Sequence, residues 1–111
     1  MRLNHVALTV ADRERSAAFY AEHFGLTERV HDDEHLLILP APDGALLALR
    51  EGPVSAELPL SNHFGFQVES EGEVRAARDR LHRAGVPETE WQEYGPVRVQ
   101  VADPDGYRVE L

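Results

Sequence analysis

Residues 103–111, with the sequence DPDGYRVEL, carry the pattern from which the fold is inferred. Proline presets φ, aspartate can hydrogen-bond its own backbone and glycine permits positive φ, so DPDG predicts a tight turn. The residues that follow alternate, which predicts a β-strand with Arg108 and Glu110 on one face and Tyr107, Val109 and Leu111 on the other. Residues 42–44, PDG, repeat this turn before another predicted strand at 45–50. The recurrence predicts two copies of one structural unit.

The length and composition are those of one folded domain. The chain has 111 residues, of which 42% are hydrophobic, so we expect a single domain over residues 1–111 with one core. No apolar run is long enough to span a bilayer, and residues 1–5 do not resemble the apolar part of a signal peptide. We therefore expect a cytoplasmic protein that does not bind membranes.

Cysteine content and charge exclude several classes of function. The chain has no cysteine, which excludes disulfide scaffolds, thiolate metal sites and cysteine nucleophiles. Any metal would therefore be held by histidine and carboxylate side chains. The formal net charge of −9 argues against nucleic-acid binding and mildly favours cationic or metal-bound partners.

The first half of the chain reads as a βαβββ module. Residues 3–10 alternate as a strand with His5 on its polar face, and Asp12 is a good N-cap for a helix that runs to Phe24 and stops at Gly25. Further strands are predicted at 27–32, 36–39 and 45–50. The module covers about residues 1–51.

The second half repeats this plan. Residues 62–68, NHFGFQV, align with residues 4–10, NHVALTV. Ser70 and Glu73 form a capping box for a helix that stops at Gly85, and strands are predicted at 88–93, 97–102 and in the final residues. Equivalent positions are separated by 58 residues at the first strands, 60 at the helix stops and 62 at the final turns. The sequence therefore predicts an α+β fold of two βαβββ modules, the second covering about residues 61–111.

The repeat gives three polar residues a common role. His5 and His63 occupy equivalent positions on the polar faces of their strands, and Glu110 corresponds to Ala48. Symmetric packing of the modules would bring both histidines and the carboxylate to a shared centre. Two histidines and one carboxylate with open positions suit Fe(II), Mn(II), Zn(II), Ni(II) or Co(II).

These residues resemble the vicinal oxygen chelate superfamily, which includes glyoxalase I, extradiol dioxygenases, fosfomycin-resistance enzymes and bleomycin-binding proteins. The resemblance covers nearly the whole chain and is carried by residues 3–5, 12–25, 62–66 and 103–111. It implies a curved mixed sheet with helices on the outer face, and a divalent metal held by His5, His63 and Glu110. It also implies a homodimer whose subunits share the sites, with His5 and Glu110 from one subunit or from two.

The resemblance leaves the reaction open. The glyoxalase I pattern has a further carboxylate where this chain has Ala48, and Glu51 is expected on the opposite face. The fosfomycin enzymes usually carry a threonine near the first histidine, where this chain has Ala7. Lyase, isomerase, transferase and dioxygenase chemistry on a small substrate chelated through oxygens all remain, with Glu110 as the nearest catalytic base. The alternative is a non-catalytic antibiotic-binding protein of the bleomycin-resistance type, for which the acidic charge favours a cationic drug.

Strand alternation also predicts residues that contact the substrate. Those expected to share the face of the metal ligands are Thr9, Arg50, Gln67, Arg98, Gln100 and Arg108. Several guanidinium groups near a cation suit an anionic or oxygen-rich substrate, although an arginine such as Arg98 can instead pair with a nearby acid. Trp91 and Tyr94 either wall this cleft or pack elsewhere. Residues 31–35, HDDEH, are expected to form a hydrated turn.

Overall fold

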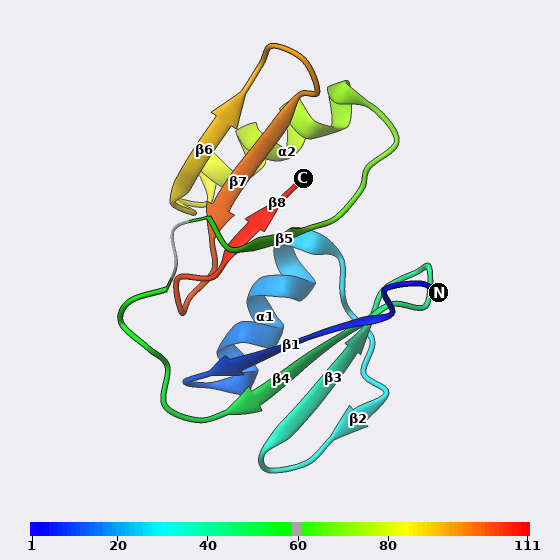
Figure 1. The fold of residues 1–111 in the computed structure, drawn as a ribbon, viewed down its shortest axis with the longest axis vertical. Coiled ribbons are helices and arrows are strands. Elements are labelled where there is room, and N and C mark those ends of the chain that lie inside the picture. Colours follow the sequence, from blue (N-terminus) through cyan, green and yellow to red (C-terminus); the bar gives the residue numbers. More distant parts are fainter. Residues whose placement is uncertain (59–60) are drawn as a thin grey trace. The chain divides into compact units, whose positions relative to one another are not determined.

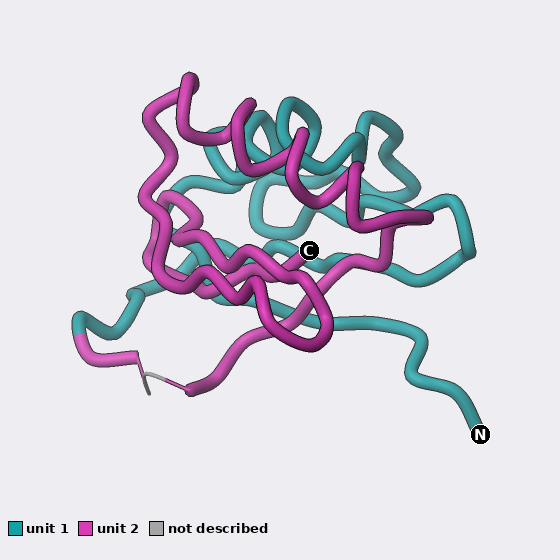
Figure 2. Tube along the Cα trace, turned by 90° about the horizontal axis from the view of Figure 1, so that it is seen from above, with its two compact units in different colours: residues 1–56 teal, residues 57–111 magenta. Residues whose placement is uncertain are grey.

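The computed structural model describes residues 1–58 and 61–111, which form two compact units, residues 1–56 and 57–111 (Figure 2). Each unit has the order βαβββ (Figure 1). Unit 1 contains β1 (His5–Val10), α1 (Arg13–Phe24), β2 (His31–Asp32), β3 (Leu36–Pro40) and β4 (Leu46–Glu51). Unit 2 contains β5 (His63–Gly65), α2 (Glu71–Arg83), β6 (Glu88–Gln92), β7 (Arg98–Ala102) and β8 (Arg108–Glu110). The predicted α+β fold with two βαβββ modules is confirmed.

Each unit contains one mixed four-stranded sheet, with strand order β1-β4-β3-β2 in unit 1 and β5-β8-β7-β6 in unit 2. The first and last strands of each unit pair in parallel, and the other neighbours are antiparallel. His5 lies opposite Leu46 in unit 1, and His63 lies opposite Arg108 in unit 2. These pairs are related by the intervals of 58 and 62 residues found in the sequence, so the repeat extends to the hydrogen-bond register.

The two glycine turns have the same geometry. Gly44 and Gly106 have φ of 89° and 92°, values that a residue with a side chain rarely adopts. Gly44 N–H donates to the carbonyl of Ala41 at 2.9 Å, and Gly106 N–H donates to the carbonyl of Asp103 at 3.0 Å. The buried Oδ1 of Asp103 also accepts from the N–H groups of Asp105 and Tyr107, each at 2.9 Å. The turn that identified the fold therefore fixes where the Glu110 strand begins.

The helices start and stop at the predicted residues. Asp12 accepts from the Arg15 N–H at 3.0 Å at the start of α1, and Ser70 caps α2 through the Glu73 N–H. Gly25 and Gly85 follow the two helices with φ of 73° and 74°. No helix in the described residues has the length and apolar character that a membrane crossing requires.

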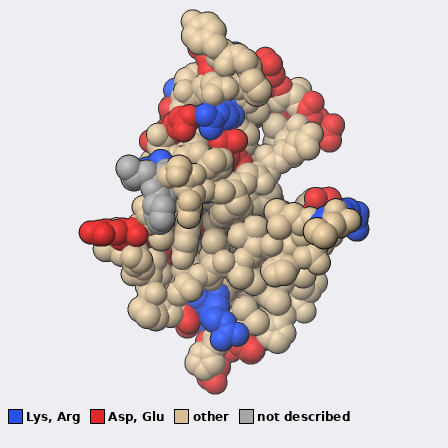
Figure 3. Space-filling model, viewed as in Figure 1, with Lys and Arg blue, Asp and Glu red and all other residues tan. Residues whose placement is uncertain are grey.

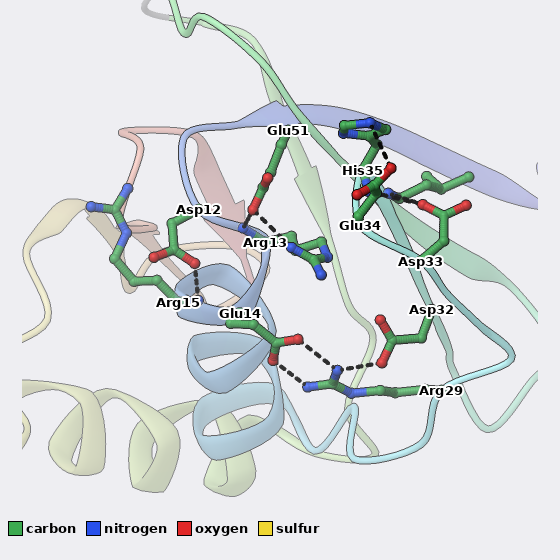
Figure 4. A network of polar contacts seen from close by, with 11 residues as sticks. Asp12, Arg13, Glu14, Arg15, Arg29, Asp32, Asp33, Glu34, His35 and Glu51 are labelled. Atoms are coloured by element: carbon green, nitrogen blue, oxygen red, sulfur yellow. Dashed lines mark hydrogen bonds and ion pairs between the residues drawn. The ribbon is translucent and has the colours of Figure 1, made fainter.

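The first turn of α1 is tied to the strands of unit 1 by carboxylates (Figure 4). Glu51 Oε1 accepts from both the backbone N–H and the guanidinium of Arg13, each at 3.1 Å. A carboxylate at this position is favourable because the N-terminus of a helix carries partial positive charge. Arg29 joins Glu14 of the helix to Asp32 of β2. Glu51 thus faces the helix side of its sheet, as predicted.

Each helix covers one face of its own sheet with apolar side chains. In unit 1, Tyr20 of α1 is fully buried together with Leu37 and Leu49. In unit 2, Leu81 of α2 is buried together with Val99. Burial of such side chains contributes about 1.5–3 kcal/mol each. The opposite face of each sheet is therefore the one on which His5, His63 and Glu110 lie.

The strands β2 and β5 are each four residues shorter than predicted, and both shortfalls have a physical cause. Continuing the β2–β3 register backward would set Arg29 opposite Pro40 and Thr27 opposite Pro42, and proline has no N–H to donate. Pairing of β2 therefore begins at His31 rather than at residue 27. Similarly, β5 stops at Gly65 rather than continuing to residue 68, because its partner β8 ends at Glu110.

A β-bulge in β6 turns two nearby glutamates to opposite faces. Glu88 is paired with Val101 but Glu90 is paired with Gln100, so the register shifts by one residue between them. Glu88 accordingly faces α2, where it binds Arg78 at 2.7 and 3.0 Å and His82 at 2.6 Å. The Arg78 guanidinium also lies 4.1 Å from the centre of the Trp91 ring. Trp91 therefore packs against α2 and does not line the face of Glu110.

We expect Glu88→Gln to destabilise the protein near pH 7 by about 1 kcal/mol, and by progressively less in acid. The guanidinium of Arg78, and after it His82, lower the pKa of the Glu88 carboxyl below its usual value of 4.5. A carboxyl whose folded-state pKa is lowered stabilises the fold above its unfolded pKa and loses that contribution as pH falls through the folded value. Urea unfolding of both proteins at pH 7 and pH 3.5 measures the difference, with the exposed Glu28→Gln as control. A difference that grows in acid would contradict this assignment.

Candidate functional site

The polar face of the unit 2 sheet is assembled by strand register. Side chains directly opposite each other on neighbouring strands share a face. Glu90 of β6, Gln100 of β7, Glu110 of β8 and Gly65 of β5 form one row across the four strands. His63 lies two residues from Gly65 on the same strand and therefore on the same face. The predicted alignment of His63, Gln100, Arg98 and Arg108 with Glu110 is thus reproduced in the register.

His63 and Glu110 lie close together on this face, on the neighbouring strands β5 and β8. The Nε2 atom of His63 lies 3.6 Å from the Oε2 atom of Glu110, and their side chains are 40% and 23% exposed. His63 Nδ1 lies 2.9 Å from the carbonyl oxygen of Ser61. A carbonyl oxygen can only accept, so Nδ1 carries the proton and donates it. In the neutral imidazole, Nε2 is then an acceptor that faces another acceptor, an arrangement that a proton or a metal ion between the two atoms would stabilise.

The donors of this pair fit a divalent metal in type and in spacing. Imidazole nitrogen and carboxylate oxygen ligate first-row metals at about 2.1 Å, so two such ligands of one tetrahedral ion lie about 3.4 Å apart. The observed separation of 3.6 Å is close to this value. The hydrogen bond from Nδ1 to a backbone carbonyl is also the arrangement that fixes the tautomer of a metal-binding histidine. His63 and Glu110 can therefore act as two ligands of one ion.

His5 has a matching local environment in unit 1. It is exposed on β1, and its Nδ1 lies 2.7 Å from the side-chain oxygen of Asn4, which leaves Nε2 available. Two residues further along the strand, Ala7 lies opposite Ala48, just as Gly65 lies opposite Glu110 in unit 2. The position equivalent to Glu110 therefore carries only a methyl group, as the repeat predicted.

The three predicted metal ligands are divided between the two units, and their assembly into one ligand set stays a prediction. Within residues 1–58 and 61–111, no three His, Cys, Asp or Glu side chains gather closely enough to hold an ion. His63 and Glu110 both belong to unit 2, whereas His5 belongs to unit 1. The histidine-rich tract of residues 31–35 forms a turn in which Asp33 Oδ1 accepts from the N–H groups of His35 and Leu36.

Arg98 is held by three side chains on the face of Glu110. Its Nη1 donates to Glu110 Oε2 at 2.7 Å, its Nε donates to Gln92 Oε1 at 3.1 Å, and its Nη2 bonds to Glu90. The Glu110 carboxylate, and with it Glu90, raises the pKa of the Arg98 guanidinium further above its usual value. Arg98 thus pairs with nearby acids, which was the alternative noted for it in the sequence.

The neighbours of Glu110 include Gln100, which the sequence predicted on this face, and the Arg98 partners Glu90 and Gln92, which it did not indicate. Gln100 is almost fully buried, with its amide 3.5 Å from Glu110 Oε2 and its carbonyl accepting from the Thr89 hydroxyl at 3.1 Å. Glu90 and Gln92 anchor Arg98. Strand alternation in β6 was the sequence signal that could have found Glu90 and Gln92. The bulge before Glu90 hides this signal, because it places Glu90 on the face opposite to that of Glu88.

The remaining predicted contact residues lie on the expected faces or beyond the strands. Thr9 and Arg50 are opposite each other in unit 1, on the face of His5, and both are exposed. Arg108 lies opposite His63. Gln67 is exposed and follows the end of β5, so no strand pairing fixes its orientation. Tyr94 is 91% exposed in the loop between β6 and β7.

This geometry agrees with comparison to known proteins. Residues 2–111 match the model of the Glyoxalase/Bleomycin resistance protein/Dioxygenase superfamily. The chain belongs to this superfamily. The predicted resemblance to the vicinal oxygen chelate proteins is therefore confirmed.

Curated relatives in the superfamily include enzymes of different activity. The chain is 30% identical to a lactoylglutathione lyase of Salmonella typhimurium, over 100% of this chain and 91% of that protein. It is 35% identical to a trivalent organoarsenical cleaving enzyme of Bacillus sp. (strain MD1), over 78% of this chain. The match covers 53% of that enzyme, so the chain spans about half its length.

Solved structures of the superfamily share this fold. A possible glyoxalase from Bacillus cereus has a TM-score of 0.87 and 29% identity, covering 99% of this chain and 96% of that one. A variant of the fosfomycin resistance protein FosX of Listeria monocytogenes, in complex with Mn(II) and 1S,2S-dihydroxypropylphosphonic acid, has a TM-score of 0.85. Its identity is 23% over 99% of this chain and 87% of that chain, so this likeness concerns the fold.

Proposed function

We propose that this superfamily member is a divalent-metal-dependent enzyme that acts on a small substrate chelated through oxygen atoms. The proposed reaction is a lyase, isomerase, transferase or dioxygenase reaction. The curated relatives named lactoylglutathione lyase and organoarsenical cleaving enzyme support an enzymatic role. The proposed metal ligands are His5, His63 and Glu110, with His5 supplied by the same chain or by a second copy in a homodimer.

One observation carries the proposal. His63 Nε2 and Glu110 Oε2 face each other at 3.6 Å while Nδ1 of the same imidazole donates to the Ser61 carbonyl. An imidazole fixed in this tautomer presents its lone pair to a carboxylate, a combination that a cation between them stabilises. The Mn(II) ion in the FosX complex adds support from a protein of the same fold.

The bound cation would supply Lewis-acid chemistry at the substrate oxygens. The side chains of the chain have separate tasks. Glu110, 23% exposed, is the candidate general base, because its carboxylate can accept a proton from a substrate carbon or hydroxyl group beside it. Thr9, Arg50, Gln67 and Arg108 are the proposed substrate contacts, and the nearly buried Gln100 is proposed to line the site beside Glu110. Arginines at this face suit an anionic or oxygen-rich substrate.

Metal titration of the purified chain tests the proposal. We expect metal-free protein, prepared without a histidine tag, to bind one ion for each proposed ligand set when titrated separately with Mn(II), Fe(II), Co(II), Ni(II) and Zn(II). Retention of the metal through gel filtration, measured by elemental analysis, is the readout. Failure of all five metals to bind stoichiometrically would contradict the proposal. Binding of an aromatic cationic drug by such a metal-free chain would instead support the non-catalytic alternative.

A further inference from the structure

Arg98 forms an ion pair with Glu110, the carboxylate that is proposed as a metal ligand. Its Nη1 lies 2.7 Å from Glu110 Oε2, the same oxygen atom that faces His63 Nε2 at 3.6 Å. The guanidinium and the proposed cation therefore act on one oxygen atom. In the structure, Glu110 is neutralised by a positive charge that belongs to the chain itself.

The position of Arg98 is fixed by the sheet rather than by Glu110 alone. Gln92 lies directly opposite Arg98 on β6 and accepts from its Nε at 3.1 Å. Glu90 binds Nη2, so each of the three guanidinium nitrogens has one protein partner. A guanidinium held in this way acts on the site through Glu110 and has few donors left for a substrate anion.

We propose that Arg98 is a positioning residue that serves as a built-in counter-charge for Glu110, stabilising the carboxylate in the metal-free chain and weakening its affinity for a divalent ion. This inference rests on the proposed function. A positive charge about 5 Å from a bound divalent cation repels it, and even with the strong screening of bulk water this repulsion lowers the affinity at least about tenfold. Glu90 would keep Arg98 paired with a carboxylate if Glu110 bound a metal ion.

Arg98→Gln removes the positive charge beside Glu110. Arg98→Lys keeps that charge but changes the hydrogen-bonding geometry, so the two variants separate the effect of charge from that of geometry. We expect Arg98→Gln to bind Mn(II) or Zn(II) about tenfold more tightly than the wild type in calorimetric titration. Arg98→Lys keeps the charge and should remain within about twofold of the wild type. In excess chelator Arg98→Gln should unfold at a lower temperature than the wild type, and saturating metal should reverse that order. Arg83→Gln, which removes the same charge from the last turn of α2, is the matched control.

The outcomes separate this inference from the proposed function. A wild-type chain that binds no metal overturns the proposed function, and this inference with it. Equal or weaker metal binding by Arg98→Gln, beside a wild type that does bind, overturns the inference alone. So does an Arg98→Lys protein that binds as tightly as Arg98→Gln, because charge would then not be the cause.

Discussion

Replacing His63 with alanine should lower the affinity of the chain for a divalent cation by about a hundredfold or more. Loss of a residue that only supports a metal ligand costs about 10–100-fold in affinity, and loss of a ligand itself costs at least as much. The variant retains Glu110, but Arg98 at 2.7 Å is then the principal positive partner of that carboxylate. Calorimetric titration of Mn(II) or Zn(II) into metal-free wild type and variant measures the change.

His35→Ala provides the control for this prediction. His35 is 73% exposed in the turn between β2 and β3, and its substitution removes one imidazole while leaving the proposed ligands in place. His82 is less suitable because it binds Glu88. His63 is itself 40% exposed on a three-residue strand, so His63→Ala should leave the unfolding temperature of the metal-free protein nearly unchanged. Equal metal affinities of His63→Ala and wild type would contradict the ligand assignment.

The sequence predicted the fold well because its strongest signals are local. The Gly44 and Gly106 turns, the Gly25 and Gly85 helix stops and the Asp12 and Ser70 caps each depend on the conformational preference of one residue. The repeat adds a long-range constraint, because two modules with the same turns, helix caps and helix stops form the same hydrogen-bond register. Together, the local signals and the repeat predicted that His63 and Glu110 share one face of the sheet, and the strand register agrees.

The network around Glu110 could not be predicted in the same way. A bulge between Glu88 and Glu90 breaks the period of two on which face assignments depend, and nothing in the sequence of β6 marks it. Without the bulge, both glutamates would face Arg78 or both would face Arg98. The orientation of Arg98 toward Glu110, Glu90 and Gln92 depends on side chains from three strands, which alternation along a single strand does not determine.

The two modules share one hydrogen-bond register, but they carry different residue types on the sheet faces that the helices do not cover. Positions 62 residues apart carry Ile38 and Gln100, and also Ala48 and Glu110, each pair placed alike by its sheet. Figure 3 shows charged side chains of both signs over β6 and β7, and the mostly tan surface over β1, β4 and β3 also carries a basic side chain with acidic groups near it. The uncovered face of unit 1 therefore carries His5 with Thr9 and Arg50, whereas that of unit 2 carries the network around Glu110 and Arg98.

Gly65→Val is expected to damage both the fold of unit 2 and its metal site. Gly65 lies directly opposite Glu110, and a Cβ atom there would come within 3.1 Å of the Glu110 carbonyl oxygen and 3.3 Å of its Cβ. Valine adds two methyl groups to this crowding, and overpacking of this kind typically costs about 1–3 kcal/mol. Because Glu110 must move to relieve it, we expect metal affinity to fall at least about tenfold, in the range seen when a metal ligand loses its support.

Ala7→Val is the matched control, because Ala7 lies opposite Ala48 at the equivalent position of unit 1. Valine favours strands more than glycine or alanine does, so without crowding both substitutions would be neutral or stabilising. A loss of stability at residue 65 alone, measured by urea unfolding without metal, therefore reports the contact with Glu110. A Gly65→Val protein as stable as the wild type and equal to it in metal affinity would show that Glu110 does not need the space that glycine leaves.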